Sequence, residues 1–194
     1  MIRPKSSSGF TLIEMVIVLG IIAILASILV PTLSKYVGDA RLRRAQDDVK
    51  LICSAIGQLQ SDTGRYPVSS DFSGGTKNDV ETLFGPGDNP TEPDAARQWG
   101  SGKVTDALND QIMTNAANYP ITGTNKWNGP YLSELRADPW GNAYLLNVKF
   151  LQPSQLSNLK SVFVLSAGPN GEINTVFDGD TVTPGDDDIV CRIK

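Results

Sequence analysis

The most constraining feature of this sequence is an apolar stretch from Phe10 to Val30 that is interrupted only by Glu14. Its length is about what an α-helix needs to cross the hydrocarbon core of a bilayer. The leader before it carries Arg3 and Lys5 and no acidic residue. Because positive charge favours the cytoplasmic side, this asymmetry predicts a single membrane-spanning helix with everything after Val30 across the membrane.

Glu14 is out of place in a simple membrane anchor, because a carboxylate inside a membrane helix costs about 2.5–3.5 kcal/mol on insertion scales. The apolar stretch contains no basic residue that could pair with it. Cleavage between Gly9 and Phe10 would create an α-ammonium one helical turn away, and the ammonium of a neighbouring subunit would serve equally well. The alternatives are a plain one-span anchor or a secretory signal peptide cleaved near Ala23 and Ala26, and both leave Glu14 unexplained.

The run GFTLIE at residues 9–14, next to a basic leader, resembles the class III signal of type IV pilins and type II secretion pseudopilins. In that family a membrane-embedded aspartyl prepilin peptidase cuts after the glycine and N-methylates the new first residue. The resemblance therefore implies cleavage between Gly9 and Phe10 and methylation of Phe10. It also implies that residues 10–30 form a transmembrane helix through which subunits polymerise, with Glu14 setting the register between neighbours.

Composition excludes several classes of function. The chain has 194 residues, which after a leader at residues 1–9 and one span leaves enough for a single soluble domain. Loss of Arg3 and Lys5 with the leader changes the formal charge from −4 to −4 − 2 = −6. An acidic chain without a basic cluster argues against nucleic-acid binding. The absence of histidine and of any nucleophile motif argues against an enzyme.

Residues 31–64 predict an amphipathic continuation of the helix outside the membrane. Apolar residues recur at spacings of four and three and form a stripe that another element must cover: Ala45, Val49, Ile52, Ile56 and Leu59. The basic group at 41–44 is either a solvated face or a contact with acidic residues of a neighbouring subunit. Gly64, with Pro67 close behind it, predicts a left-handed cap at the end of the helix.

Gly20 and Pro31 weaken the helix from within, because glycine lowers helix propensity and proline removes a backbone hydrogen bond. In relatives of the resembled family, the segment between two such residues can unwind within the filament. Residues 20–31 are the corresponding segment here, and a simple bend at Pro31 is the alternative.

Residues 65–128 predict a loop-rich insertion, because glycine, proline, asparagine, aspartate and serine dominate it. Short helices are expected at 78–84 and 104–117, where Val80 with Leu83 and Leu108 with Ile112 have helical spacing. The insertion makes this chain longer than a typical major pseudopilin. It could decorate a filament surface or bind a partner, and the sequence does not distinguish these roles.

Residues 129–194 predict a small sheet. The runs NGPYL at 128–132 and DPWGN at 138–142 resemble marks of the major pseudopilin branch of type II secretion systems. Antiparallel strands are expected at three β-rich segments, 143–150, 161–166 and 189–193. The expected fold class is α+β and pilin-like: a long N-terminal α-helix, transmembrane in its first half, packed on a small C-terminal antiparallel β-sheet.

Between the last two expected strands lies a glycine-bent loop rich in oxygen donors. Such a loop suits Ca²⁺, although composition alone favours a solvated acidic loop. Major pseudopilins carry a Ser-x-Gly-Pro-Asp-Gly run and a later Asp-Asp-Ile that cradle one Ca²⁺, and the resemblance implies the same cofactor here. The implied ligands are the side chains of Asn170, Asp178, Asp180, Asp187 and Asp188 with the backbone of Ala167, Glu172 and Gly185. Asn170 stands where the family has aspartate, which weakens the site.

Cys53 lies in the predicted helix beside the buried stripe, and Cys191 lies in the last predicted strand. If that strand packs on the helix, the two residues can meet and form a disulfide in an exported domain. Two separate buried thiols are the alternative.

The resemblance implies a structural subunit of a periplasmic pseudopilus that drives protein export by a type II secretion system. The implied partners are further copies of the chain in a homopolymer, minor pseudopilins, the prepilin peptidase, membrane lipid, and an inner-membrane assembly platform with its cytoplasmic ATPase. The expected location is a single pass of the inner membrane with the soluble domain in the periplasm. The alternative is a type IV pilin subunit of a surface fibre for adhesion, motility or DNA uptake.

Overall fold

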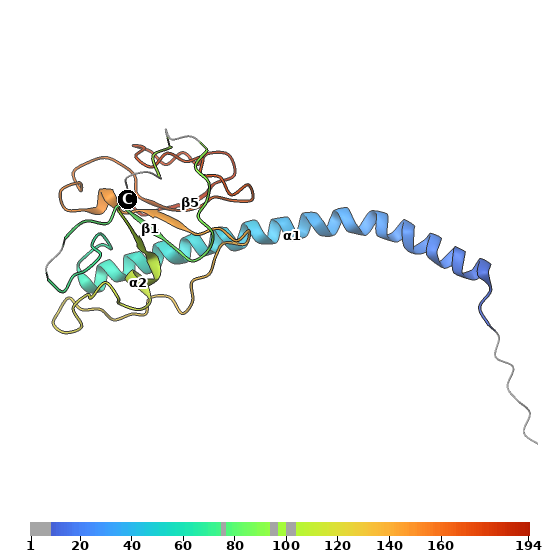
Figure 1. Cartoon of the computed structure of the whole chain (residues 1–194), viewed down its shortest axis with the longest axis horizontal. Coiled ribbons are helices and arrows are strands. Elements are labelled where there is room, and N and C mark those ends of the chain that lie inside the picture. The colour runs from blue at the N-terminus through green and yellow to red at the C-terminus, as the bar shows by residue number, and fades with distance from the viewer. Residues whose placement is uncertain (1–8, 75–76, 94–96, 100–103) are drawn as a thin grey trace, which may run out of the picture. The chain divides into compact units, whose positions relative to one another are not determined.

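The computed structural model describes residues 9–74, 77–93, 97–99 and 104–194 (Figure 1). Most of the predicted leader, including Arg3 and Lys5, lies outside the described residues. The chain divides into two units, Met1–Ala40 and Arg41–Lys194, and helix α1 (Leu12–Thr63) contributes to both.

In the first unit, every large apolar side chain from Phe10 to Val30 is exposed, so none of the described residues covers this surface. Helix α1 is long and apolar enough here to cross a membrane. It continues through Pro31 without interruption, and the segment between Gly20 and Pro31 is helical in the single chain. The hydroxyl of Ser27 donates to the carbonyl of Ile24 at 2.7 Å, which satisfies a polar group that lipid could not.

In the second unit, the predicted stripe of α1 is buried. The buried residues of this helix recur at three- and four-residue spacings, so a single face is covered: Ala45, Val49, Ile52, Ala55, Ile56, Leu59 and Thr63. The helix ends where the sequence predicts, because Gly64 adopts φ +66° and its N–H donates to the carbonyl of Gln60 at 2.9 Å.

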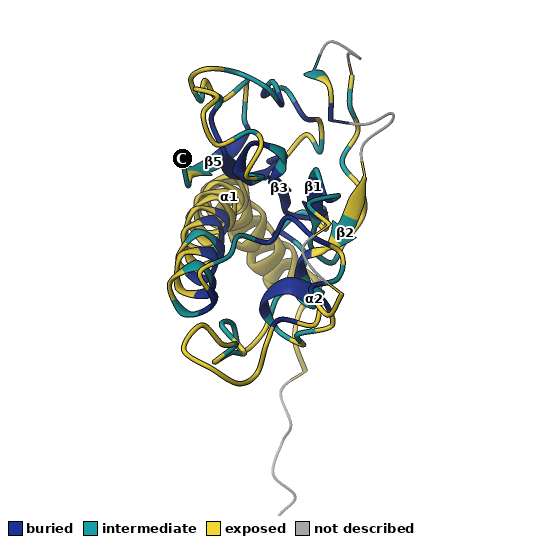
Figure 2. Ribbon diagram, turned by 90° about the vertical axis from the view of Figure 1, so that its left-hand side faces the viewer, coloured by how far each residue is buried: buried dark blue, intermediate teal, exposed yellow. Residues whose placement is uncertain are grey.

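A five-stranded sheet packs against this face of α1 (Figure 2). Its order is β2 (Thr105–Ala107), β1 (Thr82–Phe84), β3 (Leu145–Asn147), β4 (Phe163–Ser166) and β5 (Ile189–Arg192). Strands β1 and β2 pair in parallel, and all other pairs are antiparallel. A one-turn helix α2 (Leu108–Ile112) and a 3₁₀ turn (Lys149–Leu151) complete the regular structure of the described residues. The α+β class is therefore confirmed.

The first of the two helices expected in the insertion is wrong, because residues 78–81 are not helical, and the second is right only in part. Residues 82–84 of the first form β1, in which Thr82 pairs with Asn147 of β3. The second is interrupted, because residues 105–107 form β2 and only Leu108–Ile112 is helical. Two apolar residues three or four apart also fit a short strand followed by a turn, and pairing with β3 decides between them. The sheet accordingly has five strands where three were expected.

The insertion also builds the core of the second unit. Its buried side chains pack into the same cluster as α1 and the sheet, and the largest are Phe72, Trp99 and Tyr119. The rings of Phe72 and Tyr119 lie 4.3 Å apart between centroids. The insertion is therefore a structural part of this unit and not only a surface decoration.

Candidate functional site

The first site is the N-terminal end of α1, where Thr11 and Glu14 form a capping box. One carboxylate oxygen of Glu14, Oε2, accepts hydrogen bonds from the backbone N–H and the hydroxyl of Thr11, both at 2.8 Å. The N–H of Glu14 donates back to the Thr11 hydroxyl at 3.3 Å. This is the reciprocal arrangement that satisfies the free N–H groups of a helix start.

The capping box gives Glu14 a local reason to sit at this position before any partner arrives. Its charge lies in the first turn of the helix, where the exposed N–H groups favour an anion. Gly9 and Phe10 precede the helix and are both exposed, and a Cβ at Gly9 would meet no atom within 4 Å. The predicted cleavage position is therefore uncovered and non-helical.

The second site is the acidic loop between β4 and β5. Asp188 is 7% exposed, and its Oδ2 accepts three hydrogen bonds, from the N–H of Asn174 at 2.9 Å and from the N–H and hydroxyl of Thr175 at 2.6 Å each. Oδ2 of Asp187 accepts from the N–H of Asn170 at 3.0 Å. The structure thus brings three of the predicted ligand residues, Asn170, Asp187 and Asp188, to one place.

The remaining carboxylate oxygens of this pair are unsatisfied. Oδ1 of Asp187 and Oδ1 of Asp188 are both buried and accept no hydrogen bond. Burial raises the pKa of the Asp188 carboxyl above its ordinary value, and its hydrogen bonds from residues 174 and 175 oppose that rise. A buried carboxylate oxygen without a partner costs free energy, so each of these oxygens is a candidate to bind a proton or a cation.

Glycines bring the two ends of the loop together. Gly168 adopts φ +65° and lies so close to Asp187 that an added Cβ would collide with its carbonyl oxygen and lie 2.9 Å from its Oδ2. Gly185 packs against Asn174, where a Cβ would lie 2.6 Å from the carbonyl oxygen. Larger residues at these positions would force the loop apart.

The donor set suits a hard cation that accepts mixed oxygen ligands. Among the described residues, no group of three or more cysteine, aspartate or glutamate side chains is arranged to hold a metal. Two carboxylate oxygens without partners remain, beside a glycine-bent backbone and Asn170, whose side-chain oxygen accepts from the N–H of Glu172 at 2.7 Å. Ca²⁺ accepts such sets, because it takes six to eight oxygens from carboxylates, amides and backbone carbonyls in flexible geometry. The residues present therefore fit Ca²⁺.

Asp180 is directed elsewhere in this structure. Oδ1 of Asp180 pairs with the ammonium of Lys160 at 2.8 Å, and its carbonyl accepts from the hydroxyl of Ser161 at 3.1 Å. The hydrogen bond that Lys160 donates to Asp180 and the negative charges of Asp180 and Asp178 raise the pKa of Lys160. To reach the other acidic residues, Asp180 would have to give up its lysine partner.

Several residues that hold the loop carried no sequence signal of their own. Buried Asp138, within DPWGN, accepts from the N–H groups of Trp140 and Asn142 at 3.0 and 2.8 Å and from the hydroxyl of Ser166, which begins the loop, at 2.7 Å. From the insertion, the indole N–H of Trp99 donates to the carbonyl of Thr175 at 2.8 Å. The DPWGN turn is thus an anchor for the acidic loop, and only that motif's resemblance could have suggested it.

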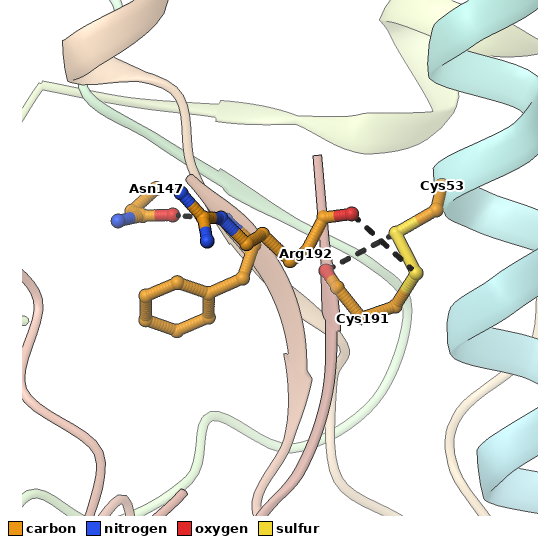
Figure 3. The surroundings of a disulfide bond; sticks show 5 residues. Cys53, Asn147, Cys191 and Arg192 are labelled. Carbon is orange, nitrogen blue, oxygen red and sulfur yellow. Dashed lines mark hydrogen bonds between the residues drawn. A yellow bond between two sulfur atoms is a disulfide. The ribbon is translucent and has the colours of Figure 1, made fainter. Parts of the chain in front are cut away.

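Cys53 of α1 and Cys191 of β5 form a disulfide, with their Cα atoms 6.5 Å apart (Figure 3). The bond spans a sequence separation of 138 residues and therefore ties the last strand to the long helix. Of the two arrangements that the sequence left open, the structure has the bridged one.

On the outer side of α1, part of the basic group at 41–44 is already paired. Arg44 lies 3.5 Å from Asp48, which also accepts a hydrogen bond from the hydroxyl of Tyr144 at 2.9 Å. These three residues line a cleft of about 110 Å³ together with Glu134 and Arg136, which pair with each other. This cluster fastens α1 to the sheet as a polar complement to the apolar core.

Comparisons with known proteins agree on one family. A family model for the prokaryotic N-terminal methylation motif matches residues 4–30, and one for type II secretion system protein G matches residues 105–183. The chain is 31% identical to the type II secretion system core protein G of Escherichia coli K12 over 170 residues, 88% of this chain and 87% of that protein. It is 26% identical to the protein of the same name from Aeromonas hydrophila over 173 residues, 89% and 90% of the two chains. No solved structure matches the chain significantly.

Proposed function

This chain belongs to the type II secretion system protein G family, the major pseudopilins, and we propose that it enters its filament as a processed, N-methylated subunit. Members of this family are structural subunits of the pseudopilus that serves protein secretion, and the chain is such a membrane-anchored filament subunit. Within that role, the prepilin peptidase cuts between Gly9 and Phe10, and the domain that follows residue 40 lies in the periplasm.

The observation that supports assembly through α1 is its uncovered surface. All large apolar side chains from Phe10 to Val30 are exposed, and the only charge among them is Glu14. Lipid covers this surface in the free subunit, and neighbouring copies cover it in the filament. Oε2 of Glu14 accepts both hydrogen bonds from Thr11, so Oε1 is the oxygen that meets the amine of the next subunit's Phe10.

Processing and assembly are tested separately in cells that carry the secretion system. Gly9→Val should abolish cleavage, whereas Gly20→Ala, at a helical glycine with open space around it, should be cleaved normally. Glu14→Gln should be cleaved and inserted but should fail to form sheared filaments. If Glu14→Gln assembles as well as the unaltered chain, the pairing with the neighbour's amine is wrong. Long surface fibres in place of short periplasmic ones would favour the type IV pilin alternative.

The acidic loop is the second part of the proposal: it binds one Ca²⁺. Asp187 and Asp188 would hold the ion through their unpartnered Oδ1 atoms, with Asn170 and backbone carbonyls of Ala167, Glu172 and Gly185 completing the shell. The ion would neutralise a self-repelling loop and stabilise the folded state by mass action. Asp178 is a further candidate ligand, and Asp180 belongs to the set only if Lys160 releases it.

Calorimetry with Ca²⁺ on the full chain in detergent tests this site. Asp188→Asn should abolish the heat of binding. Asp47→Asn, at an exposed acid on α1 that pairs with Lys50, should leave it unchanged. Asp180→Asn separates the two ligand sets, because it weakens binding only if Asp180 contributes a ligand. Absence of heat from the unaltered chain at millimolar Ca²⁺ would refute the site and leave the filament role untouched.

The remaining partners are those of the assembly machinery. Minor pseudopilins would share the same apolar helix surface, and an inner-membrane platform driven by a cytoplasmic ATPase would lift each subunit from the lipid. The exposed stretch of α1 is common to both contacts, which makes Glu14 the residue at which they compete.

A further inference from the structure

Strand β5 is one of the two edge strands of the sheet, and little of its surface is buried. It lies at the sheet edge and pairs only with β4 among the described residues. Of its four residues only Ile189 is buried, whereas Val190 and Cys191 are half-buried and Arg192 is exposed. An edge strand with so little apolar burial opens readily unless something else holds it.

Two interactions, here called fastenings, hold this strand: one acts just before its first residue and the other at its third. Asp188, the proposed metal ligand, immediately precedes Ile189, and Cys191 is covalently joined to Cys53 of α1 (Figure 3). Three residues of extended chain separate the two fastenings, about 10 Å. Beyond the strand, the N–H of Ile193 donates to the carbonyl of Val162 at 2.7 Å, so opening would concern β5 and the acidic loop before it.

Without a cation, like-charge repulsion and unpaired buried oxygens destabilise the start of β5. Asp186, Asp187 and Asp188 are consecutive, and the Oδ1 atoms of the last two are buried without partners. Both the mutual repulsion and the unmet desolvation fall if the loop swings away from the sheet into water. The disulfide opposes that movement, because it keeps Cys191 next to α1 whatever the charge of the loop.

We propose that the Cys53–Cys191 disulfide positions the calcium ligands, so that the bond and the ion are thermodynamically coupled through β5. Either fastening alone keeps β5 on the sheet, and the loss of both releases it. By linkage, the factor by which the bond tightens Ca²⁺ binding equals the factor by which bound Ca²⁺ favours formation of the bond. The bond thereby offsets the neutral Asn170 in the ligand set.

This inference rests on the proposed metal site, and its test is a two-by-two comparison on the full chain in detergent. The unaltered protein and the Cys53→Ala/Cys191→Val double variant are each examined with EDTA and with saturating Ca²⁺. Amide hydrogen exchange of residues 186–193, read by mass spectrometry, reports whether β5 is closed. Isothermal calorimetry gives the dissociation constant of Ca²⁺. Ile112→Val, a buried change in α2, serves as a control that lowers global stability without touching β5.

Strand β5 is expected to be open in only one of the four combinations of protein and solution. Residues 189–192 stay protected in the unaltered protein with or without Ca²⁺, and in the double variant they exchange rapidly in EDTA and slowly in Ca²⁺. The Ca²⁺ dissociation constant rises about tenfold in the double variant, within the range usual for coupled sites, and is unchanged in Ile112→Val. Mg²⁺, which is smaller and demands octahedral geometry, should not restore protection.

Several results would overturn the inference. Equal dissociation constants with and without the disulfide would show that the two fastenings act independently. Protection of β5 in the double variant with EDTA would show that neither fastening is needed to keep the strand closed. A double variant that is unfolded even with saturating Ca²⁺ would show that the ion alone cannot hold the strand. If the unaltered protein binds no Ca²⁺, the metal site itself is wrong and the coupling falls with it, which the unaltered arm alone reveals.

Discussion

Substitution of Gly168 by alanine offers the sharpest test of how the acidic loop is built. Gly168 has φ +65°, and its missing Cβ leaves the space that the carbonyl oxygen of Asp187 occupies. A methyl group there would collide with backbone, which cannot move out of the way as the end of a flexible side chain can. The variant therefore has to adopt an unfavourable left-handed backbone conformation and also displace Asp187.

The two contributions can be separated, because Gly64 has nearly the same φ, +66°, and a Cβ there would meet only the flexible side chain of Asn125 at 3.2 Å. A non-glycine residue in the left-handed region costs about 1–2 kcal/mol, which Gly64→Ala and Gly168→Ala share. Overpacking adds about 1–3 kcal/mol to Gly168→Ala alone. For a unit of this size, about 2–4 °C of melting temperature follows each kcal/mol.

Thermal unfolding of the full chain in detergent, followed by circular dichroism in EDTA, measures the difference. For Gly64→Ala, a free-energy loss of about 1–2 kcal/mol should lower the melting temperature by about 5 °C. For Gly168→Ala, a loss of about 2–5 kcal/mol should lower it by about 10 °C. Equal losses within 2 °C would mean that the loop tolerates the methyl group and that the close approach of Gly168 to Asp187 does not hold it together. If the losses differ as expected, added Ca²⁺ should stabilise the Gly64→Ala chain but not the Gly168→Ala chain.

Three further variants test how the rest of the unit supports the loop, each by chemical denaturation of the full chain. Trp99→Ala, at a side chain that is 2% exposed, should lose about 3–5 kcal/mol of unfolding free energy, and a loss below 1 kcal/mol would contradict its core position. Asp138→Ala leaves three donors without their acceptor and should lose about 3 kcal/mol, with weaker Ca²⁺ binding as the readout specific to the loop. Tyr144→Phe removes only the hydrogen bond to Asp48 and should lose about 1 kcal/mol with unchanged Ca²⁺ binding.

Elements defined by long-range periodicity were the ones that sequence could predict. The stripe from Ala45 to Leu59 repeats over several turns, so its buried face and its end at Gly64 follow from the sequence alone. Strands β4 and β5 are short, but each is an apolar or β-branched run beside turn residues, and both lie within the ranges expected.

The insertion resisted prediction because its order comes from distant partners. Strand β1 has three residues and exists because Leu146 of β3 and Asp106 of β2 pair with Leu83 on either side. Trp99 is an isolated aromatic residue in a loop, and its burial depends on the rings of Phe163 and Phe177. Such pairings join residues far apart in the chain, and no local pattern encodes them.

The same reasoning applies to the acidic loop. That Asp187 and Asp188 lie together follows from the chain itself, but their contacts with residues 170 and 174–175 depend on glycines that allow the loop to fold back. Composition alone does not predict which acidic residues are available, because the carboxylate of Asp180 pairs with Lys160. A count of acidic residues identifies a loop that could hold a cation, and only the backbone path decides which oxygens are left for it.

The exposed half of α1 has a consequence for what drives filament growth. Burial of a large apolar side chain from water yields about 1.5–3 kcal/mol, so the stretch from Phe10 to Val30 would gain tens of kcal/mol on leaving water. Lipid already supplies that gain, and moving the same side chains from lipid to neighbouring helices adds little, because lipid tails are as apolar as leucine. The free-energy preference for the filament over lipid must therefore come largely from groups that lipid solvates poorly. Glu14 is the one charge in the stretch, and contacts of the domain after residue 40 are a second source. It follows that Glu14→Gln and loss of domain contacts should each weaken assembly, whereas Ile17→Leu, which keeps the apolar surface, should not.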